Sequence, residues 1–193
     1  MRVIAGIRKG HRLLAPHGNR VRPTSDRVRT VLFDILGASV AGAKVLDLFA
    51  GAGGLGIEAL SRGAASADFV DNDRGHAETI RANLSRTHLD DRGRVIVQDA
   101  LAYLSAGEMR HSYTLIFADP PYQFSSYETL LDLAARHGNL AEGGRMILEV
   151  SSRTESAPKA ELLDLIASRT VGETALLFYQ AKHEQTGDLS GNL

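Results

Sequence analysis

The sequence predicts one α/β domain built on a doubly wound, mostly parallel, seven-stranded sheet of the Rossmann-like kind. A chain of 193 residues that is 44% hydrophobic is long enough for one such domain and too short for two ordinary ones. From Lys44 onward, buried apolar runs alternate with amphipathic stretches, which is typical of parallel strands joined by right-handed helical crossovers. A glycine-rich loop directly follows the first of these runs, as in nucleotide-binding folds of this class.

Residues 1–38 are expected to form an N-terminal arm. Short apolar runs on either side of the turn region Gly6 to Gly10 predict a small hairpin. The residues Thr24-Ser25-Asp26, after Pro23, predict the start of a helix, and apolar residues recur at helical spacing from there to Gly37. The arm is therefore expected to end in a helix.

The main domain is expected to span residues 39–183, with residues 184–193 as a disordered tail. Strands are predicted at 45–49, 67–70, 95–97, 113–117 and 145–150, and helices at 55–62, 74–88, 100–105 and 126–137. A further helix is predicted at 161–166, followed by an antiparallel closing strand at 174–180.

Composition excludes several kinds of chemistry. Without cysteine there is no disulfide framework, thiolate metal site or cysteine nucleophile, and the seven histidines show no paired ligand spacing, so no metal site is expected. No apolar run is long enough to cross a bilayer, and the first residues lack the features of a signal peptide. A soluble, cytoplasmic protein is expected.

Charge is distributed unevenly along the chain. Residues 1–30 carry eight lysines and arginines against the single acid Asp26, whereas the remainder carries 14 basic against 22 acidic residues. A basic arm on an acidic body is typical of proteins that bind polyanions. We expect the arm to dock nucleic acid through phosphates and to be dispensable for holding a cofactor. The residues proposed for this contact are Arg2, Arg8, Lys9, Arg12, Arg22, Arg27 and Arg29.

The loop after the first predicted strand contains G-x-G-x-x-G at Gly51, Gly53 and Gly56. Such glycines let the backbone approach a bound nucleotide, and alone they also fit a dinucleotide enzyme. The carboxylate of Asp47, ahead of the glycines, favours a cationic sulfonium ligand over a pyrophosphate. Asp71, at the tip of the next strand, can accept both ribose hydroxyls. These residues indicate S-adenosylmethionine as the cofactor.

Asp99 ends the third predicted strand at the same edge of the sheet. Two interpretations stay open: its carboxylate receives the adenine amino group of the cofactor, or it caps the helix predicted at 100–105.

The most specific motif is Asp119-Pro120-Pro121-Tyr122, which ends an apolar strand. The two prolines remove two backbone donors and fix an extended conformation. The rigid loop can present the Asp119 carboxylate and the Pro120 carbonyl to the two hydrogens of an exocyclic NH₂, while Tyr122 stacks on the base. The pattern predicts methyl transfer to such an amine.

With these motifs, the sequence resembles the RsmD-type 16S ribosomal RNA guanine-N2 methyltransferases, which have the class I methyltransferase fold. The resemblance runs from Arg2 to about Gln180 and rests on MRVIAG with Lys9-Gly10, RPTSDRVRTVLFDIL, VLDLFAGAGGLGIEALSRGA, FVDND and ADPPY. The family usually has Glu at the position of Asp71 and often a small residue other than glycine at Gly54. The shorter carboxylate puts the strength of the ribose contact in question.

The resemblance implies site residues and a substrate. Cofactor contacts would be Asp47, Phe49, Gly51, Gly53, Glu58, Asp71, Asn72, Asp99 and Ala100, and Asp119 to Tyr122 would hold the target amine. The substrate would be 16S rRNA in the small ribosomal subunit or an assembly intermediate, methylated by a monomeric enzyme.

Three other interpretations remain: an adenine-N6 DNA methyltransferase, a dinucleotide-dependent oxidoreductase, and a catalytically silent RNA-binding assembly factor. The DNA enzymes share Asp-Pro-Pro-Tyr, but the 67 residues between Gly51 and Asp119 leave no room for a target-recognition domain. An oxidoreductase would need a catalytic constellation that the sequence lacks, and a silent binder would not need an intact Asp119–Tyr122 motif.

Overall fold

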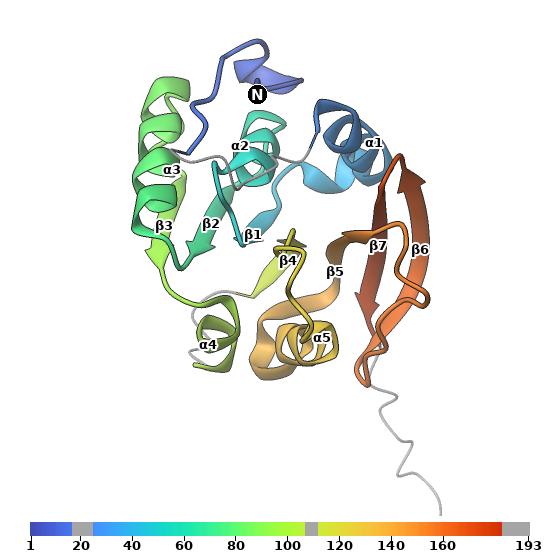
Figure 1. The fold of residues 1–193 in the computed structure, drawn as a ribbon. Coiled ribbons are helices and arrows are strands. Elements are labelled where there is room, and N and C mark those ends of the chain that lie inside the picture. The colour runs from blue at the N-terminus through green and yellow to red at the C-terminus, as the bar shows by residue number, and fades with distance from the viewer. Residues whose placement is uncertain (17–24, 107–111, 183–193) are drawn as a thin grey trace, which may run out of the picture.

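The computed structural model describes residues 1–16, 25–106 and 112–182. Its strands are β1 (Lys44–Leu48), β2 (Ser66–Asp71), β3 (Gly93–Val97), β4 (Tyr113–Ala118), β5 (Leu140–Ser151), β6 (Leu163–Val171) and β7 (Thr174–Ala181). They form one sheet in the order β3-β2-β1-β4-β5-β7-β6 (Figure 1). β7 pairs antiparallel with β5 and β6, and the pairs among β1 to β5 are parallel. This is the predicted class I methyltransferase sheet.

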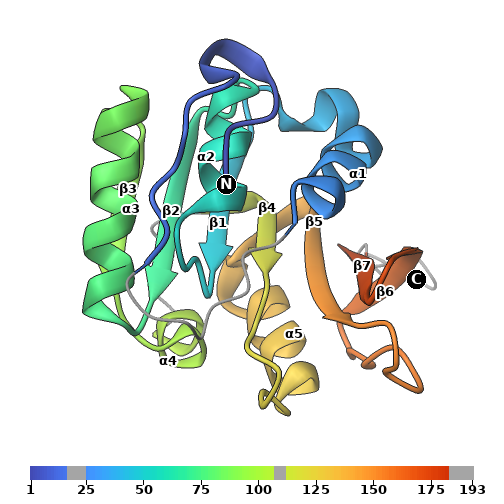
Figure 2. The same ribbon diagram turned by 45° about the horizontal axis from the view of Figure 1, so that its top comes forward.

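Helices cover both faces of the sheet. The α-helices are α1 (Asp26–Leu36), α2 (Gly54–Ser61), α3 (Arg74–Thr87), α4 (Ala100–Ser105) and α5 (Tyr127–Ala135), and short 3-10 helices occupy Gly6–Arg8, Gly37–Val40 and Arg136–Gly138. Figures 1 and 2 show α1, α2 and α3 on one face and α4 and α5 on the other. The molecule therefore has three layers.

The central strands are mostly apolar because both of their faces are buried. In β1, Val45 joins the core beneath α1, α2 and α3, whereas Leu46 and Leu48 join the core beneath α4 and α5. Asp47 lies between them in the sequence and is a polar exception within this strand.

The N-terminal arm has the predicted elements. Arg2 and Arg12 form an antiparallel bridge around the turn, and Ser25 caps α1 by accepting a hydrogen bond from the Val28 N–H, 3.2 Å away. Gly37 ends α1 with a φ of 51°. Val3 and Leu13 are buried in the same core as α2 and α3, so the hairpin packs onto the main domain.

The helix predicted at 161–166 is wrong, because Leu163–Val171 forms the edge strand β6. The pairing with β7 shifts between Leu165 and Ala167, which leaves Ile166 as an extra residue. This bulge interrupts the strand alternation and leaves apolar pairs three residues apart, which imitates a helix. The predicted antiparallel strand is confirmed as β7, although it lies inside the sheet and β6 is the edge.

The sheet order also creates a reversal point. Chain order runs from β1 outward to β2 and β3, and then returns to β4 on the other side of β1. Ligands of open α/β sheets bind at the carboxyl ends of the strands beside such a point. No helix among the described residues is long and apolar enough to cross a membrane.

Candidate active site

The glycine loop joins β1 to α2 beside the reversal point. Gly53 precedes α2 with a φ of 78°, a left-handed conformation that side chains disfavour. A Cβ atom on Gly56 would lie 2.3 Å from the Phe69 ring, so this position needs glycine for helix and strand to pack. The loop is therefore as compact as its sequence predicts.

Asp47 lies beneath this loop, with 2% of its surface exposed. Its Oδ2 accepts a hydrogen bond from the Gly56 N–H at 2.8 Å. Burial, opposed by that hydrogen bond and aided by the negative charges of Asp119 and Asp71, raises the pKa of Asp47 to about 8. A cationic group near the loop would relieve this cost of ionisation.

Asp71 ends β2 and is fixed from several sides. Its Oδ2 accepts from the Gly51 N–H at 2.8 Å, and its Oδ1 accepts from the Asp73 N–H at 3.0 Å. The His76 Nδ1 lies 3.0 Å from the same Oδ1. The carboxylate therefore ties the glycine loop to the start of α3, and its Oδ2, which accepts one of these bonds, has a further lone pair for a ligand.

The other proposed cofactor contacts follow β2 and β3. Asp99 is the N-cap of α4, because its Oδ1 accepts from the Ala102 N–H at 3.0 Å, and Ala100, the first residue of α4, is buried. The capping interpretation of Asp99 is thus confirmed, and a ligand contact through its other oxygen stays a prediction. Asn72 is exposed directly after β2.

The Asp119–Tyr122 loop follows β4, next to the glycine loop, because Leu48 and Ala118 are paired. Phe49 has a φ of 57°, a strained value for a residue other than glycine. Its ring packs edge-on against Phe124 with centroids 5.2 Å apart, and Phe124 packs in the same way against Tyr127 at 5.3 Å. This aromatic cluster joins the two loops.

Charge and exposure in this loop fit the predicted roles. Asp119 is half-buried, Pro120 is buried, Pro121 is exposed, and Tyr122 is 75% exposed. Burial and the negative charge of Asp119 together raise the pKa of Tyr127, which places this tyrosine in the field of the carboxylate. A large aromatic side chain so exposed beside a half-buried acid is available to stack on a base.

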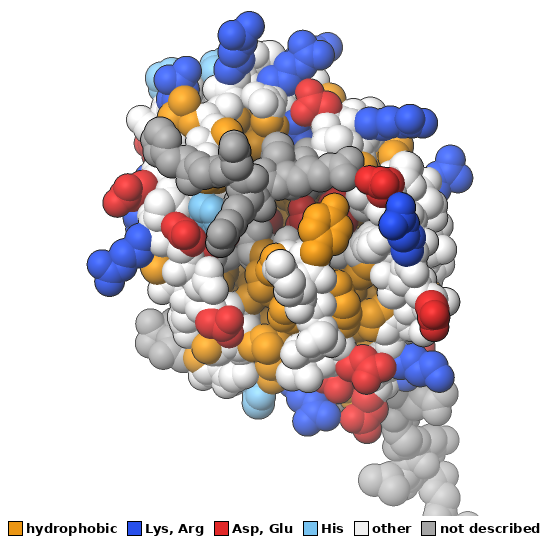
Figure 3. Space-filling model, in the orientation of Figure 1, with side chains coloured by type: hydrophobic (Ala, Val, Ile, Leu, Met, Phe, Trp, Pro, Cys, Tyr) orange, Lys and Arg blue, Asp and Glu red, His pale blue; other side chains and the backbone are white. Residues whose placement is uncertain are grey.

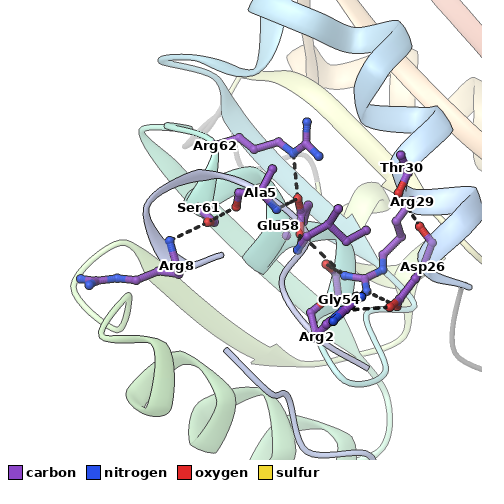
Figure 4. A network of polar contacts seen from close by, with 12 residues as sticks. Arg2, Ala5, Arg8, Asp26, Arg29, Thr30, Gly54, Glu58, Ser61 and Arg62 are labelled. Atoms are coloured by element: carbon purple, nitrogen blue, oxygen red, sulfur yellow. Dashed lines mark hydrogen bonds and ion pairs between the residues drawn. The ribbon is translucent and has the colours of Figure 1, made fainter. Parts of the chain in front are cut away.

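The cofactor contact implied for Glu58 is contradicted by its surroundings (Figure 4). Glu58 is fully buried, and its carboxylate accepts from the Ile4 and Ala5 N–H groups and from Arg62. Arg29, proposed to bind RNA, is fully buried as well and bonds to Asp26. Both residues therefore have a structural role. The spacing of apolar residues predicted the helices α1 and α2, but it did not predict that these two charged side chains point into the core.

The remaining basic residues proposed to bind RNA gather near the start of the chain. Figure 3 shows Lys and Arg side chains clustered at the top of the view, over the N-terminal segment drawn there in Figure 1. Arg8 is half-buried and donates to the His88 carbonyl at the end of α3 at 3.2 Å. Arg22 lies outside the described residues. The exposed members are Arg2, Lys9, Arg12 and Arg27.

Sequence reasoning missed His76, Phe124 and Tyr127. His76 sits five residues after Asp71, on the first turn of α3, and that helical position was the only signal that could have placed it against the carboxylate. Phe124 and Tyr127 follow the Asp119–Tyr122 motif directly, and their aromatic character near a base site was a usable signal.

Comparison with known proteins gives consistent matches over the whole fold. The model of the family described as Conserved hypothetical protein 95 matches residues 1–180. The Bacillus subtilis protein YlbH is 37% identical over 183 residues, which cover 94% of this chain and 100% of that protein. Ribosomal RNA small subunit methyltransferase D of Escherichia coli K12 is 31% identical over 188 residues, covering 97% and 93%. The solved structure of the Escherichia coli protein yhhF superimposes with a TM-score of 0.81 at 30% identity, covering 94% of this chain and 98% of that one.

Proposed function

The chain belongs to the Conserved hypothetical protein 95 family, and from this premise we propose that it transfers a methyl group from S-adenosylmethionine to the N2 amine of a guanine in 16S rRNA. The observation that carries the proposal is the meeting of two loops at the sheet reversal, the glycine loop with its acids and the Asp119–Tyr122 loop. The name of the Escherichia coli relative supports the small ribosomal subunit as the source of the RNA.

The acids at this edge fit a cationic cofactor. Asp47, Asp71 and Asp119 lie close enough for the charges of the latter two to raise the pKa of the first. Such a field attracts a ligand with sulfonium and ammonium groups and repels a pyrophosphate, which argues against a dinucleotide. Asp47 would stabilise the cofactor cation from beneath the glycine loop, and Asp71 would accept the ribose hydroxyls. When bound, S-adenosylmethionine supplies a methyl group on a positively charged sulfur.

The Asp119–Tyr122 loop would hold the base. The Asp119 carboxylate and the Pro120 carbonyl accept the two amine hydrogens, and Tyr122 stacks on the extruded guanine. The lone pair of an aromatic amine is delocalised into the ring, so gripping both hydrogens favours the pyramidal nitrogen needed for attack. The aromatic cluster of Phe49, Phe124 and Tyr127 keeps this loop in register with the cofactor loop.

Removal of the proton from the methylated amine needs no strong base. On accepting the methyl group that the cofactor would supply, the amine nitrogen would become cationic and its proton acidic. Asp119 stabilises that developing charge and can accept the proton, or pass it to water. The methyl group would leave the cofactor as a neutral thioether, and the guanine would carry it on N2.

RNA docking is assigned to the N-terminal segment, residues 1–16, together with Arg27 on α1. Arg2, Lys9, Arg12 and Arg27 are exposed there, and Ile7 is an exposed apolar residue of the same turn. Cations of this kind bind phosphates without reading sequence, while the extruded base is read in its pocket.

Methyl transfer to different acceptors tests the proposal. Purified protein with radiolabelled S-adenosylmethionine is offered undermethylated 30S particles, naked 16S rRNA and duplex DNA, and the products are digested to nucleosides. We expect label in N2-methylguanosine from RNA. Label in N6-methyladenine from DNA would identify a DNA enzyme instead, and no transfer to any acceptor with intact cofactor binding would indicate a silent assembly factor.

A further inference from the structure

Three fully buried polar side chains have no role in the proposed chemistry: Arg29 on α1, Glu58 on α2 and Asn83 on α3. Each has 0% of its surface exposed. Burying such groups is costly unless they are hydrogen-bonded. All three bond to the backbone of the N-terminal segment, and two of them bond to the glycine loop as well.

Asn83 links the N-terminal segment to the glycine loop through a single side chain. Its Oδ1 accepts from the Leu14 N–H at 2.7 Å, and its Nδ2 donates to the Leu14 carbonyl at 3.1 Å. The same Nδ2 donates to the carbonyl of Ala52, in the glycine loop, at 2.9 Å. One amide group therefore holds the far strand of the N-terminal hairpin and the cofactor loop together.

Arg29 and Glu58 form a second link at the opposite strand of the hairpin (Figure 4). Arg29 donates to the Arg2 carbonyl at 2.7 Å and to the Gly54 carbonyl at 3.4 Å. Glu58 accepts from the Ile4 N–H at 2.7 Å and from the Ala5 N–H at 3.0 Å. Its carboxylate lies 3.8 Å from the Arg29 guanidinium. The guanidinium thus spans the gap between the segment and the loop.

Direct packing reinforces these links at Gly54. A Cβ atom there would lie 2.9 Å from the Met1 sulfur, so glycine lets the first residue of the chain rest against the loop. The loop itself depends on left-handed conformations at Gly51 and Gly53, which are readily accessible to glycine but cost entropy to fix. Anchors on the Ala52 and Gly54 carbonyls therefore help to select the loop conformation.

We propose that Arg29, Glu58 and Asn83 are positioning residues that couple the N-terminal segment to the cofactor loop, so that RNA docking tightens cofactor binding. The inference rests on the proposed docking of RNA to that segment. A docked RNA restricts the segment, and the segment restricts the loop carbonyls. Cofactor binding then has less loop entropy to remove. By linkage, the cofactor tightens RNA binding by the same factor. The expectation that the arm is dispensable for holding the cofactor does not fit these contacts.

The test measures the dissociation constant of radiolabelled S-adenosylhomocysteine with and without saturating undermethylated 30S particles. Wild-type protein should bind it at least about fivefold more tightly with the particles, the lower end of common coupling factors. The ratio of the dissociation constant without particles to the one with particles should fall to near one in Asn83→Ala. Arg29→Lys, which keeps the charge beside Glu58 but loses the fork to Arg2 and Gly54, should reduce the ratio independently.

Asn139→Ala is the matched control. Asn139 also donates from a buried amide to two carbonyls, those of Leu104 and Leu133, but these end α4 and α5 on the other face of the sheet. This variant should keep the wild-type ratio, which separates coupling from general loss of stability. A wild-type ratio near one, or an unchanged ratio in both Asn83→Ala and Arg29→Lys, would overturn the inference.

The same titrations separate the inference from the function on which it rests. Charge reversal at Lys9 and Arg12 should weaken particle binding. If reversal weakens particle binding while the ratios of Asn83→Ala and Arg29→Lys both stay at the wild-type value, docking stands and coupling is wrong. If reversal leaves particle binding unchanged, docking on the segment is wrong and the coupling inference falls with it.

Discussion

Cofactor affinity should depend steeply on pH because of one buried acid. Asp47 is 2% exposed, and its pKa is raised from 3.8 to about 8 by burial, with added repulsion from Asp119 and Asp71. A shift of that size corresponds to about 6 kcal/mol for ionising the group in the free protein, as an order of magnitude. At neutral pH the free protein therefore holds a proton on Asp47.

Binding of a cationic cofactor should release this proton. The ligand charge favours the ionised form, so the pKa of Asp47 falls in the complex and affinity increases with pH until about pH 8. The association constant should rise about tenfold per pH unit, and so by nearly 100-fold between about pH 5.5 and pH 7.5. Calorimetry in buffers of different ionisation enthalpy should detect nearly one proton released per site.

Asp47→Asn is the matched control for this effect. The amide keeps an oxygen that can accept from the Gly56 N–H, but it cannot titrate. The variant should bind more weakly at about pH 7.5 and show a flat profile over the same range. A flat profile in the wild-type protein, or an equal slope in Asp47→Asn, would refute the assignment of the pH dependence to Asp47.

Three further predictions concern stacking, docking and stability. Tyr122→Ala should weaken binding of the base by about 1–3 kcal/mol while Tyr122→Phe has little effect, as measured by KM for 30S particles. Reversing Lys9 and Arg12 should make the plot of log binding constant against log salt concentration less steep, by the contribution of about two phosphate contacts. Reversing the exposed Lys159 should leave the slope unchanged. Equal slopes in the wild type and both variants would contradict docking on the segment. Because the pKa of Asp47 is higher in the folded than in the unfolded protein, its contribution to the free energy of unfolding decreases from about pH 4 to pH 8. Urea unfolding of Asp47→Asn should lack that loss. Parallel plots of unfolding free energy against pH for the wild type and Asp47→Asn would contradict this prediction.

The fold was predictable where local pattern and tertiary environment agree. Strands buried on both faces, such as β1 and β4, are nearly uninterrupted apolar runs, and the N-cap Ser25 marks the start of α1. The edge strand β6 was not predictable, because its identity depends on backbone pairing with β7 and on a bulge at Ile166. The bulge interrupts the strand alternation and leaves apolar residues at a helix-like spacing, so the sequence pattern predicts a helix where the chain forms a strand.

The candidate site shows the same division. Motif spacing placed Asp71 and Asp119 at one edge of the sheet, since both follow parallel strands. Motifs did not distinguish a charged residue that faces a ligand from one that is buried for structural reasons. Glu58 and Arg29 look functional in the sequence, but in the fold both are hydrogen-bonded to backbone groups of the N-terminal segment. Only three-dimensional contacts separate these cases.

The most direct test of the proposed chemistry is single-turnover methylation of 30S particles by Asp119 variants, with binding of S-adenosylhomocysteine measured in parallel. Asp119→Ala should lower the rate of the chemical step by about 100-fold or more while leaving cofactor affinity within a few fold of wild type. Asp119→Asn should retain part of the rate, because its amide oxygen still accepts one amine hydrogen. A wild-type rate in Asp119→Ala would place the target amine elsewhere and contradict the mechanism.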